Sequence, residues 1–309
     1  MASFPKLPAR AAYLHLANPA RRNALSLPVI QDLTSQLQKH LTSPTTGKLL
    51  TLPPFIPRKL GTLTSGEGNE FHWLVDSDEW RRQREGLPNV IVVRSEGPVF
   101  SSGHDLQEVA TMSQDECKEL FSACGDLMTL IRMSPVPVVS AVQGLATAAG
   151  AQLALTGDIV IARPSTGFQL PGMTVGLPCT SPSTALSRRL PYALAYRMFA
   201  TAQPERADRL AGAVDTDFED SDEAFEARVA ATVNQLLSMP AQPQGFGKWA
   251  FWTQVGIRGH PKRGSAPVSD GYRDALQWTS AAMAVHSQGG EAKEGIAAFL
   301  SKRKPEWTT

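Results

Sequence analysis

The chain has 309 residues, of which 42% are hydrophobic and 19% charged. This composition predicts a folded globular protein of one large or two ordinary domains, and it excludes a disordered or fibrous chain. Thirty Lys and Arg residues against 29 Asp and Glu residues leave a net charge of +1, so no global field attracts nucleic acid or an anionic membrane.

The N-terminal part begins with one strand and one helix. Residues 11–16 (AAYLHL) have the pattern of a short strand, and Ser26 is placed to cap a helix. Apolar residues then recur at helical spacing, namely Ile30, Leu33, Leu37 and Leu41. Basic residues precede the first acid, Asp32, as in a mitochondrial presequence, but strand signals begin by residue 11 and leave little to cleave.

Residues 42–89 form an insertion without a regular pattern. The segment is rich in Pro and Gly and contains one helical fragment at 78–85. A connection of this length is unusual in a compact domain. Its Trp73, its Trp80 and the RRQR run at 81–84 form either a lid or a partner surface, and the sequence leaves this choice open.

Regular elements resume at residue 90 and alternate between strand and helix. Strands are predicted at 90–94, 135–142 and 158–162, each an apolar run typical of a strand buried on both faces. Ser113 and Glu116 form a capping box for a predicted helix, and Cys117 and Cys124 lie on one face of that helix. A second helix, rich in Ala, is predicted to end at residue 156. The alternation predicts an α/β protein with a mostly parallel sheet.

The second half is predicted to be a layer of helices. They are expected at about 182–190, 192–200, 204–210, 222–237, 270–286 and 291–302, and residues 240–247 are expected to be a hinge. We therefore divide the chain into a core of residues 1–240, which includes the insertion, and a C-terminal helical region of residues 241–309.

Several well-known sites are excluded by spacing. The turn at 144–150 (GLATAAG) is neither G-x-G-x-x-G nor a P-loop, and the chain has no G-x-S-x-G or H-E-x-x-H motif. The six histidines lack metal-ligand spacing, so we expect no metal site. Three cysteines, two of them about 10 Å apart on one predicted helix, predict a reduced protein without disulfides.

Two turns are placed to present backbone N–H groups. One is Gly103-His104, and the other is the segment 148–150 at the start of the Ala-rich helix. Free N–H groups at a helix N-terminus favour a developing oxyanion. The alternative, ordinary packing of two turns of a parallel sheet, remains open at this point.

The ordered motifs resemble those of the crotonase (enoyl-CoA hydratase/isomerase) superfamily. They are residues 22–26 (RNALS), 100–106 (FSSGHDL), 137–155 (PVVSAVQGLATAAGAQLAL), 157–159 (GDI), 175–177 (VGL) and the ending 294–304. The resemblance covers about residues 11–41 and 90–305. It implies a spiral ββα core, a C-terminal helical trimerisation region, a homotrimer or dimer of trimers, and an acyl-CoA thioester held by the N–H groups of His104 and Ala149.

The catalytic acids of that family are missing. Hydratases of this family carry glutamates at the positions of Gln152 and Gly172, and some relatives carry a carboxylate at about Thr180. Each missing acid or base costs about 10²- to 10⁴-fold in rate. The resemblance therefore implies the fold, the thioester site and the oxyanion hole, but not efficient hydration.

Other site residues follow from the resemblance. Coenzyme A contacts are expected from Arg21, Arg22, Ala24, Ser102, Asp105 and Lys302, with the arginines near the phosphates. The His104 side chain and Asp105 are expected mainly to order their loop. Cys179 precedes a predicted helix, whose dipole would lower the pKa of its thiol, but inert packing is the favoured alternative. Thr180 and Ser181 are expected to be helix caps.

Three functions remain open. The chain is an enzyme that stabilises a thioester enolate for isomerisation, decarboxylation or thioester cleavage, a non-catalytic acyl-CoA-binding or scaffold protein, or an enzyme of a specialised pathway. No tightly bound cofactor, nucleic acid or membrane is expected. The resemblance points to fatty acid or acyl-CoA metabolism in the mitochondrion, and it leaves the cytoplasm and the peroxisome open.

Overall fold

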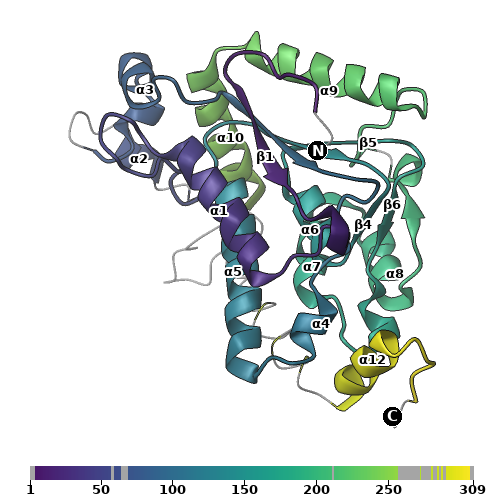
Figure 1. Ribbon diagram of the computed structural model, residues 1–309. Helices are drawn as coiled ribbons and strands as arrows, with labels where there is room; N and C mark the ends of the chain where they lie inside the picture. The colour runs from purple at the N-terminus through teal and green to yellow at the C-terminus, as the bar shows by residue number, and fades with distance from the viewer. Residues whose placement is uncertain are drawn as a thin grey trace.

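The central element of the computed structural model is a parallel sheet (Figure 1). The structure describes residues 4–56, 59–63, 69–210, 212–256 and 290–306, together with positions 272, 280, 284 and 287. The strands run in the order β1-β2-β3-β5, all parallel, with bounds Ala11–Leu16, Val90–Ser95, Val138–Val142 and Ile159–Ala162. Every residue of β2 and β3 is buried, which confirms the prediction from their unbroken apolar runs.

A second, small sheet corrects two predictions. It consists of β4 (Leu145–Thr147), β6 (Gly167–Gln169) and β7 (Glu205–Arg206). Residues 145–147 were predicted to lie in the turn at 144–150, and residues 204–210 were predicted to form a helix. The first segment is a strand, and the second is β7 followed by a 3-10 turn at Ala207–Arg209. These strands have two or three residues, too few to show an alternating pattern.

Helices cover both faces of the parallel sheet. On one face α9 (Asp222–Leu237) packs Phe225, Val229 and Val233 against alternate residues of β2 and β3. On the other face lie α1 (Leu27–Leu41), α5 (Gln114–Arg132) and α6 (Ala149–Thr156), which share the main core. The predicted capping box at Ser113 and Glu116 is present, and Cys117, Cys124 and Cys179 are not in disulfides within the described part of the chain.

The remaining helices surround this core (Figure 1). They are α7 (Thr180–Arg189), α8 (Tyr192–Thr201), α10 (Ala241–Gly256), α12 (Gly290–Leu300), and the short α2 (Lys59–Leu63), α3 (Ser77–Gln83) and α4 (Leu106–Val109). The helix predicted at 270–286 lies, apart from three single positions, outside the described residues. No helix among the described residues has the length and apolarity needed to cross a membrane.

The described part of the insertion packs against α5 and α10. Trp249 of α10 donates its indole N–H to Pro54 O at 3.2 Å, and Leu52 N donates to Met133 O at 2.8 Å. The segment expected to be a hinge lies mostly inside α10, and that expectation is wrong. A Cβ on Gly245 would stand only 2.7 Å from the Trp80 ring, so this glycine serves close packing of α10 on α3.

Candidate functional site

The two predicted turns lie side by side. Ser101 N donates to Leu145 O at 3.1 Å and Thr147 N donates to Ser101 O at 3.0 Å, so the two segments pair like short strands. Gly103, at φ +82°, fits tightly beside them, because an added Cβ would lie 2.9 Å from Thr147 O and 3.4 Å from Ala149 N. The backbone at 103–104 therefore adjoins the backbone at 148–149.

Two N–H groups at this junction lack a hydrogen-bond acceptor within the described part of the chain. Neither His104 N nor Ala149 N has an acceptor among the residues that the structure describes. Ala149 is the first residue of α6, where the helix dipole adds a partial positive charge. These two main-chain donors therefore lie on adjoining segments, one of them at a helix N-terminus.

Backbone strain at this turn falls on Ala148. Its φ of 48° and ψ of −121° lie in a region that side-chain-bearing residues rarely adopt, whereas Ala149 is helical. Such a conformation costs about 1–3 kcal/mol and persists only where its surroundings enforce it. Here Ala148 N donates to Gln169 O at 2.9 Å and its carbonyl accepts from Gln152 N at 3.0 Å.

Asn23 holds the His104 loop in place, a role that the sequence analysis missed. Its side-chain amide is fully buried and donates to Glu96 O and Val99 O at 2.7 Å each. The backbone carbonyl of Asn23 accepts a hydrogen bond from Ser101 Oγ at 2.8 Å. Nearby, Leu25 N donates to Gly103 O at 2.8 Å. The sequence signal that could have indicated this role was the presence of an Asn within the motif at 22–26.

The His104 ring serves the loop, as expected. Its Nδ1 lies 3.0 Å from Leu25 O, and the ring meets Phe121 edge-on at 5.0 Å. Burial lowers the pKa of the imidazole to about 4, because the charged form would be desolvated. The ring is therefore neutral at pH 7.

The Gln152 side chain is buried and hydrogen-bonds to Ser181. The side chain is 0% exposed, its Nε2 lies 3.2 Å from Ser181 Oγ, and its Oε1 lies 3.3 Å from the same hydroxyl. Ser181 was expected to cap α7, but it pairs with Gln152 instead, and no side chain caps that helix. An amide held this way orients neighbours but transfers no proton at neutral pH.

Position 172 has no room for a side chain. A Cβ on Gly172 would lie 2.0 Å from Leu177 O and 2.8 Å from Cys179 Sγ. Gly172 lies in the 3-10 helix η3 (Pro171–Val175), and its N–H donates to the Cys179 sulfur at 3.3 Å. Burial raises the pKa of this thiol to about 12, the opposite of the shift considered for a helix N-terminus. Cys179 therefore fills the space beside Gly172, and its thiol is protonated at neutral pH.

Two carboxylates near the His104 turn are directed at helix N-termini. Asp105 caps α4 by accepting from Gln107 N at 3.0 Å and pairs with Arg21 at 2.5 Å. Glu108, which the sequence analysis did not single out, accepts from Leu27 N at the start of α1. Burial, reinforced by the Asp105 charge, raises the pKa of Glu108. Its Oε2 is buried without a hydrogen-bond partner among the described residues.

The residues expected to contact coenzyme A fall into two groups. Arg21, Arg22, Ala24, Ser102 and Asp105 come together, because Ser102 N donates to Arg22 O at 3.0 Å and Arg21 pairs with Asp105. Lys302 follows α12, and this helix packs against η3 and lies beside α4 (Figure 1). The C-terminal helix therefore spans the segments that carry His104 and Gly172.

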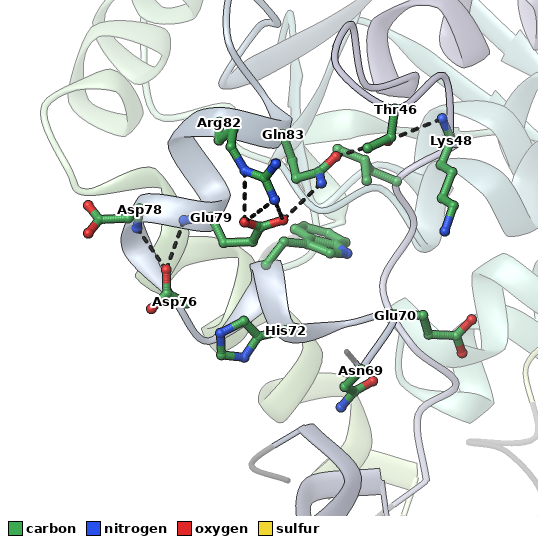
Figure 2. A pocket seen from close by; sticks show the side chains of 12 residues that line it. Thr46, Lys48, Asn69, Glu70, His72, Asp76, Asp78, Glu79, Arg82 and Gln83 are labelled. Carbon is green, nitrogen blue, oxygen red and sulfur yellow. Dashed lines mark hydrogen bonds and ion pairs between the residues drawn. The ribbon is translucent and has the colours of Figure 1, made fainter. Parts of the chain in front are cut away.

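A separate polar cavity lies within the insertion (Figure 2). Its volume is about 690 Å³, and Lys48, His72 and Glu79 are among its lining residues. Glu79 accepts from both Arg82 and Gln83, so much of this wall is already paired. Among the residues described, no cluster of three or more His, Cys, Asp or Glu side chains has the arrangement of a metal site.

Comparisons with known proteins agree on one family. The family model of enoyl-CoA hydratase/isomerase matches residues 82–243. The mitochondrial enoyl-CoA hydratase domain-containing protein 3 of Homo sapiens is 32% identical over 296 residues, covering 95% of this chain and 79% of the human one. Its Danio rerio counterpart is 32% identical over 297 residues, covering 95% and 83%.

Solved structures show the same architecture. The crystal structure of human enoyl coenzyme A hydratase domain-containing protein 3 has 28% identity and a TM-score of 0.60, with 98% of each chain covered. An enoyl-CoA hydratase from Mycobacterium avium subsp. paratuberculosis has 23% identity and a TM-score of 0.69, covering 98% of this chain and 97% of that one.

Proposed function

Because this chain belongs to the enoyl-CoA hydratase/isomerase family, within the crotonase superfamily, we propose that it binds the thioester of an acyl-CoA at the junction of the two turns. The N–H groups of His104 and Ala149 hydrogen-bond the thioester carbonyl. The single observation that carries this proposal is that these two donors adjoin and lack acceptors among the described residues.

The same donors stabilise an enolate once it forms. In a preorganised, water-poor site each oxyanion donor contributes about 3 kcal/mol to the transition state. Arg21 and Arg22, which are joined to the His104 loop through Asp105 and Ser102, bind the coenzyme A phosphates together with Lys302, which follows α12. The protein acts in acyl-CoA metabolism, and its relatives' names favour the mitochondrion.

Hydration is not the reaction of this site. Gln152 is an amide paired with Ser181, and Gly172 has neither a side chain nor the space for one. The reaction that suits such a site best is loss of a β-carboxylate, because cleavage of the C–C bond leaves its electron pair on the α carbon as the enolate. No protein base is needed for that step. CO₂ leaves as the C–C bond breaks, and the enolate then takes its α proton from water to give the shortened acyl-CoA.

Calorimetry and kinetics on variants of Ala149 test the proposal. Acetyl-CoA binding is measured for the wild type, for A149G, which keeps the N–H, and for A149P, which removes it at a helix position where Pro is tolerated. Turnover of malonyl-CoA and crotonyl-CoA is measured for the same three proteins, with circular dichroism as the folding control.

We expect A149G to behave like the wild type, and A149P to lose about 100-fold in malonyl-CoA decarboxylation. Crotonyl-CoA hydration at the rate of a glutamate-bearing hydratase contradicts the chemistry proposed. Acetyl-CoA binding without turnover of either substrate assigns the protein to non-catalytic acyl-CoA binding. Failure to bind acetyl-CoA rejects the thioester site altogether.

A further inference from the structure

A second cleft lies where α3 and the start of α10 meet the residue before β1. Its volume is about 710 Å³, and its wall includes Arg10, Trp80, Arg81 and Arg82. Helix α3 is at the opposite end of the molecule from α4, which follows the His104 turn (Figure 1). The site proposed for the thioester does not use this cleft.

Two arginines that have no carboxylate partner among the described residues hydrogen-bond to residues 87–89, beside the cleft. Arg10 donates from Nε to Leu87 O at 3.0 Å and from Nη2 to Asn89 Oδ1 at 2.9 Å. Arg84 donates from Nη2 to Pro88 O at 2.6 Å. Within the described part of the chain, neither guanidinium forms an ion pair with Asp or Glu.

Arg84 is a charge enclosed in the protein. It is 0% exposed, and its Nε and Nη1 have no hydrogen-bond partner among the described residues. The guanidinium lies 5.2 Å from the ring of Trp80, which forms part of the cleft wall. Burial, followed by the nearby Arg10 charge, lowers the pKa of Arg84 to about 9, so the group still carries its charge at pH 7. An unpaired buried charge is costly and projects a strong local potential.

The other charges at the cleft nearly cancel. Arg82 binds both oxygens of Glu79, at 2.7 Å and 2.6 Å, and Arg81 pairs with Asp78. The side chains of Arg81 and Asp78 are 76% and 85% exposed, and such a surface pair is weak, so Arg81 is free to exchange its partner. Glu85 is the remaining carboxylate on the described wall. Once these pairs are set aside, the charges that remain are those of Arg10, Arg84 and Glu85, and their sum is positive.

We propose that this cleft binds an oxyanion of the phosphate class, either inorganic phosphate or the phosphate group of a small ester. Arg10 and Arg81 are its direct ligands, because the guanidinium fork matches two phosphate oxygens. Arg84 acts through its charge, from behind the Trp80 wall. The site is independent of the proposed thioester site.

Calorimetric titration of the whole protein tests the site, at constant ionic strength and with saturating acetyl-CoA to fill any coenzyme A site. Inorganic phosphate and glycerol 3-phosphate are titrated separately, which distinguishes a free ion from an ester. The variants are R10Q and R81Q, both exposed, with R209Q as the matched control, since Arg209 is an exposed arginine outside the cleft.

We expect saturable phosphate binding that weakens about tenfold in R10Q and in R81Q and changes less than twofold in R209Q. R84M should weaken binding as well without lowering the melting temperature of the ligand-free protein; if R84M does not fold, R10Q and R81Q decide. The proposal is overturned by absence of saturable binding to the wild type, by equal binding to R10Q and R81Q, or by an equal loss in R209Q.

Discussion

Position 172 shows how one residue removes a chemistry together with the space for it. The resemblance to the family predicts that Gly172 stands where a hydratase has a glutamate, which suggests at first a simple loss of a carboxylate. The structure shows that Leu177 O and Cys179 Sγ occupy the region where even a Cβ would stand. A glutamate could return here only if the segment from 172 to 179 moved.

The first prediction compares two glycines. G172A should lower the free energy of unfolding by about 1–3 kcal/mol, because the added methyl group overpacks a buried site. G247A should raise the free energy of unfolding by between 0 and about 1 kcal/mol, because a Cβ at this position meets nothing within 4 Å and Ala favours the helix α10. Urea denaturation measures both, and equal effects would contradict the packing described.

The second prediction concerns His104 and pH. Its pKa is about 4 in the folded protein against 6.5 for the free group, so the unfolded chain takes up the proton first as the pH falls. The resulting stability, about 3 kcal/mol, is complete above pH 6.5 and is lost as the pH falls toward 4.

H104N should lack this loss while keeping the backbone N–H. Urea denaturation at pH 7 and pH 5 gives the difference for each protein. His40, whose pKa burial also lowers, contributes equally to both and cancels. A parallel decline of wild type and H104N between these pH values would show that the His104 ring is not the cause.

At the level of elements, α10 is fastened to the sheet by a buried ion pair. Lys248 of α10 lies 2.7 Å from Asp158, just before β5, and the two side chains are 8% and 18% exposed. Asp158 also accepts from Val138 N at 2.8 Å, so the pair connects α10 with β3 as well. Burial lowers the pKa of Lys248 despite the carboxylate. This attachment explains why residues 240–247 do not act as a hinge.

The third prediction is a double-mutant cycle on this pair. K248M should lower the free energy of unfolding by about 3–5 kcal/mol, because it leaves the Asp158 charge buried and unpaired. The double variant K248M/D158N should lose less than the sum of the two single variants, since neither charge remains. Strict additivity in urea denaturation would mean that the two groups are not coupled.

At the level of the whole molecule, the face formed by α8 remains to be explained. Tyr192 and Tyr196 lie one turn apart on this helix and are 69% and 70% exposed. Aromatic side chains are enriched in protein interfaces and rarely gather on a free surface without a role. The resemblance to the crotonase superfamily implies that copies of the chain assemble in threes.

The fourth prediction is the molar mass in solution. Sedimentation equilibrium should give about 100 kDa for a trimer or about 200 kDa for a dimer of trimers, from a chain of 33.3 kDa. Y192K/Y196K should shift the mass toward the monomer, with R209Q as a surface control. A monomeric wild type would reject the assembly, and an unchanged mass in Y192K/Y196K would place the interface elsewhere.

Much of the fold follows from local pattern. Helix α9 begins and ends at the predicted residues, and the capping box at Ser113 marks the start of α5. The strands predicted at 90–94 and 158–162 differ by a residue from those observed. Short segments were missed, as at β4 and β7, because two or three residues carry no periodicity. The division of the chain at residue 240 stays a prediction.

The sequence by itself determined the order of the longer strands and helices, the family motifs and the lack of acids at 152 and 172, because periodicity and residue identity are properties of the chain. The tertiary structure alone decided that His104 turns its ring to Leu25, that Cys179 fills the space beside Gly172, that Ala148 bears the strain, and that Arg84 is enclosed. These features depend on contacts between segments far apart in sequence, and burial by such contacts sets both the available space and the protonation of each group.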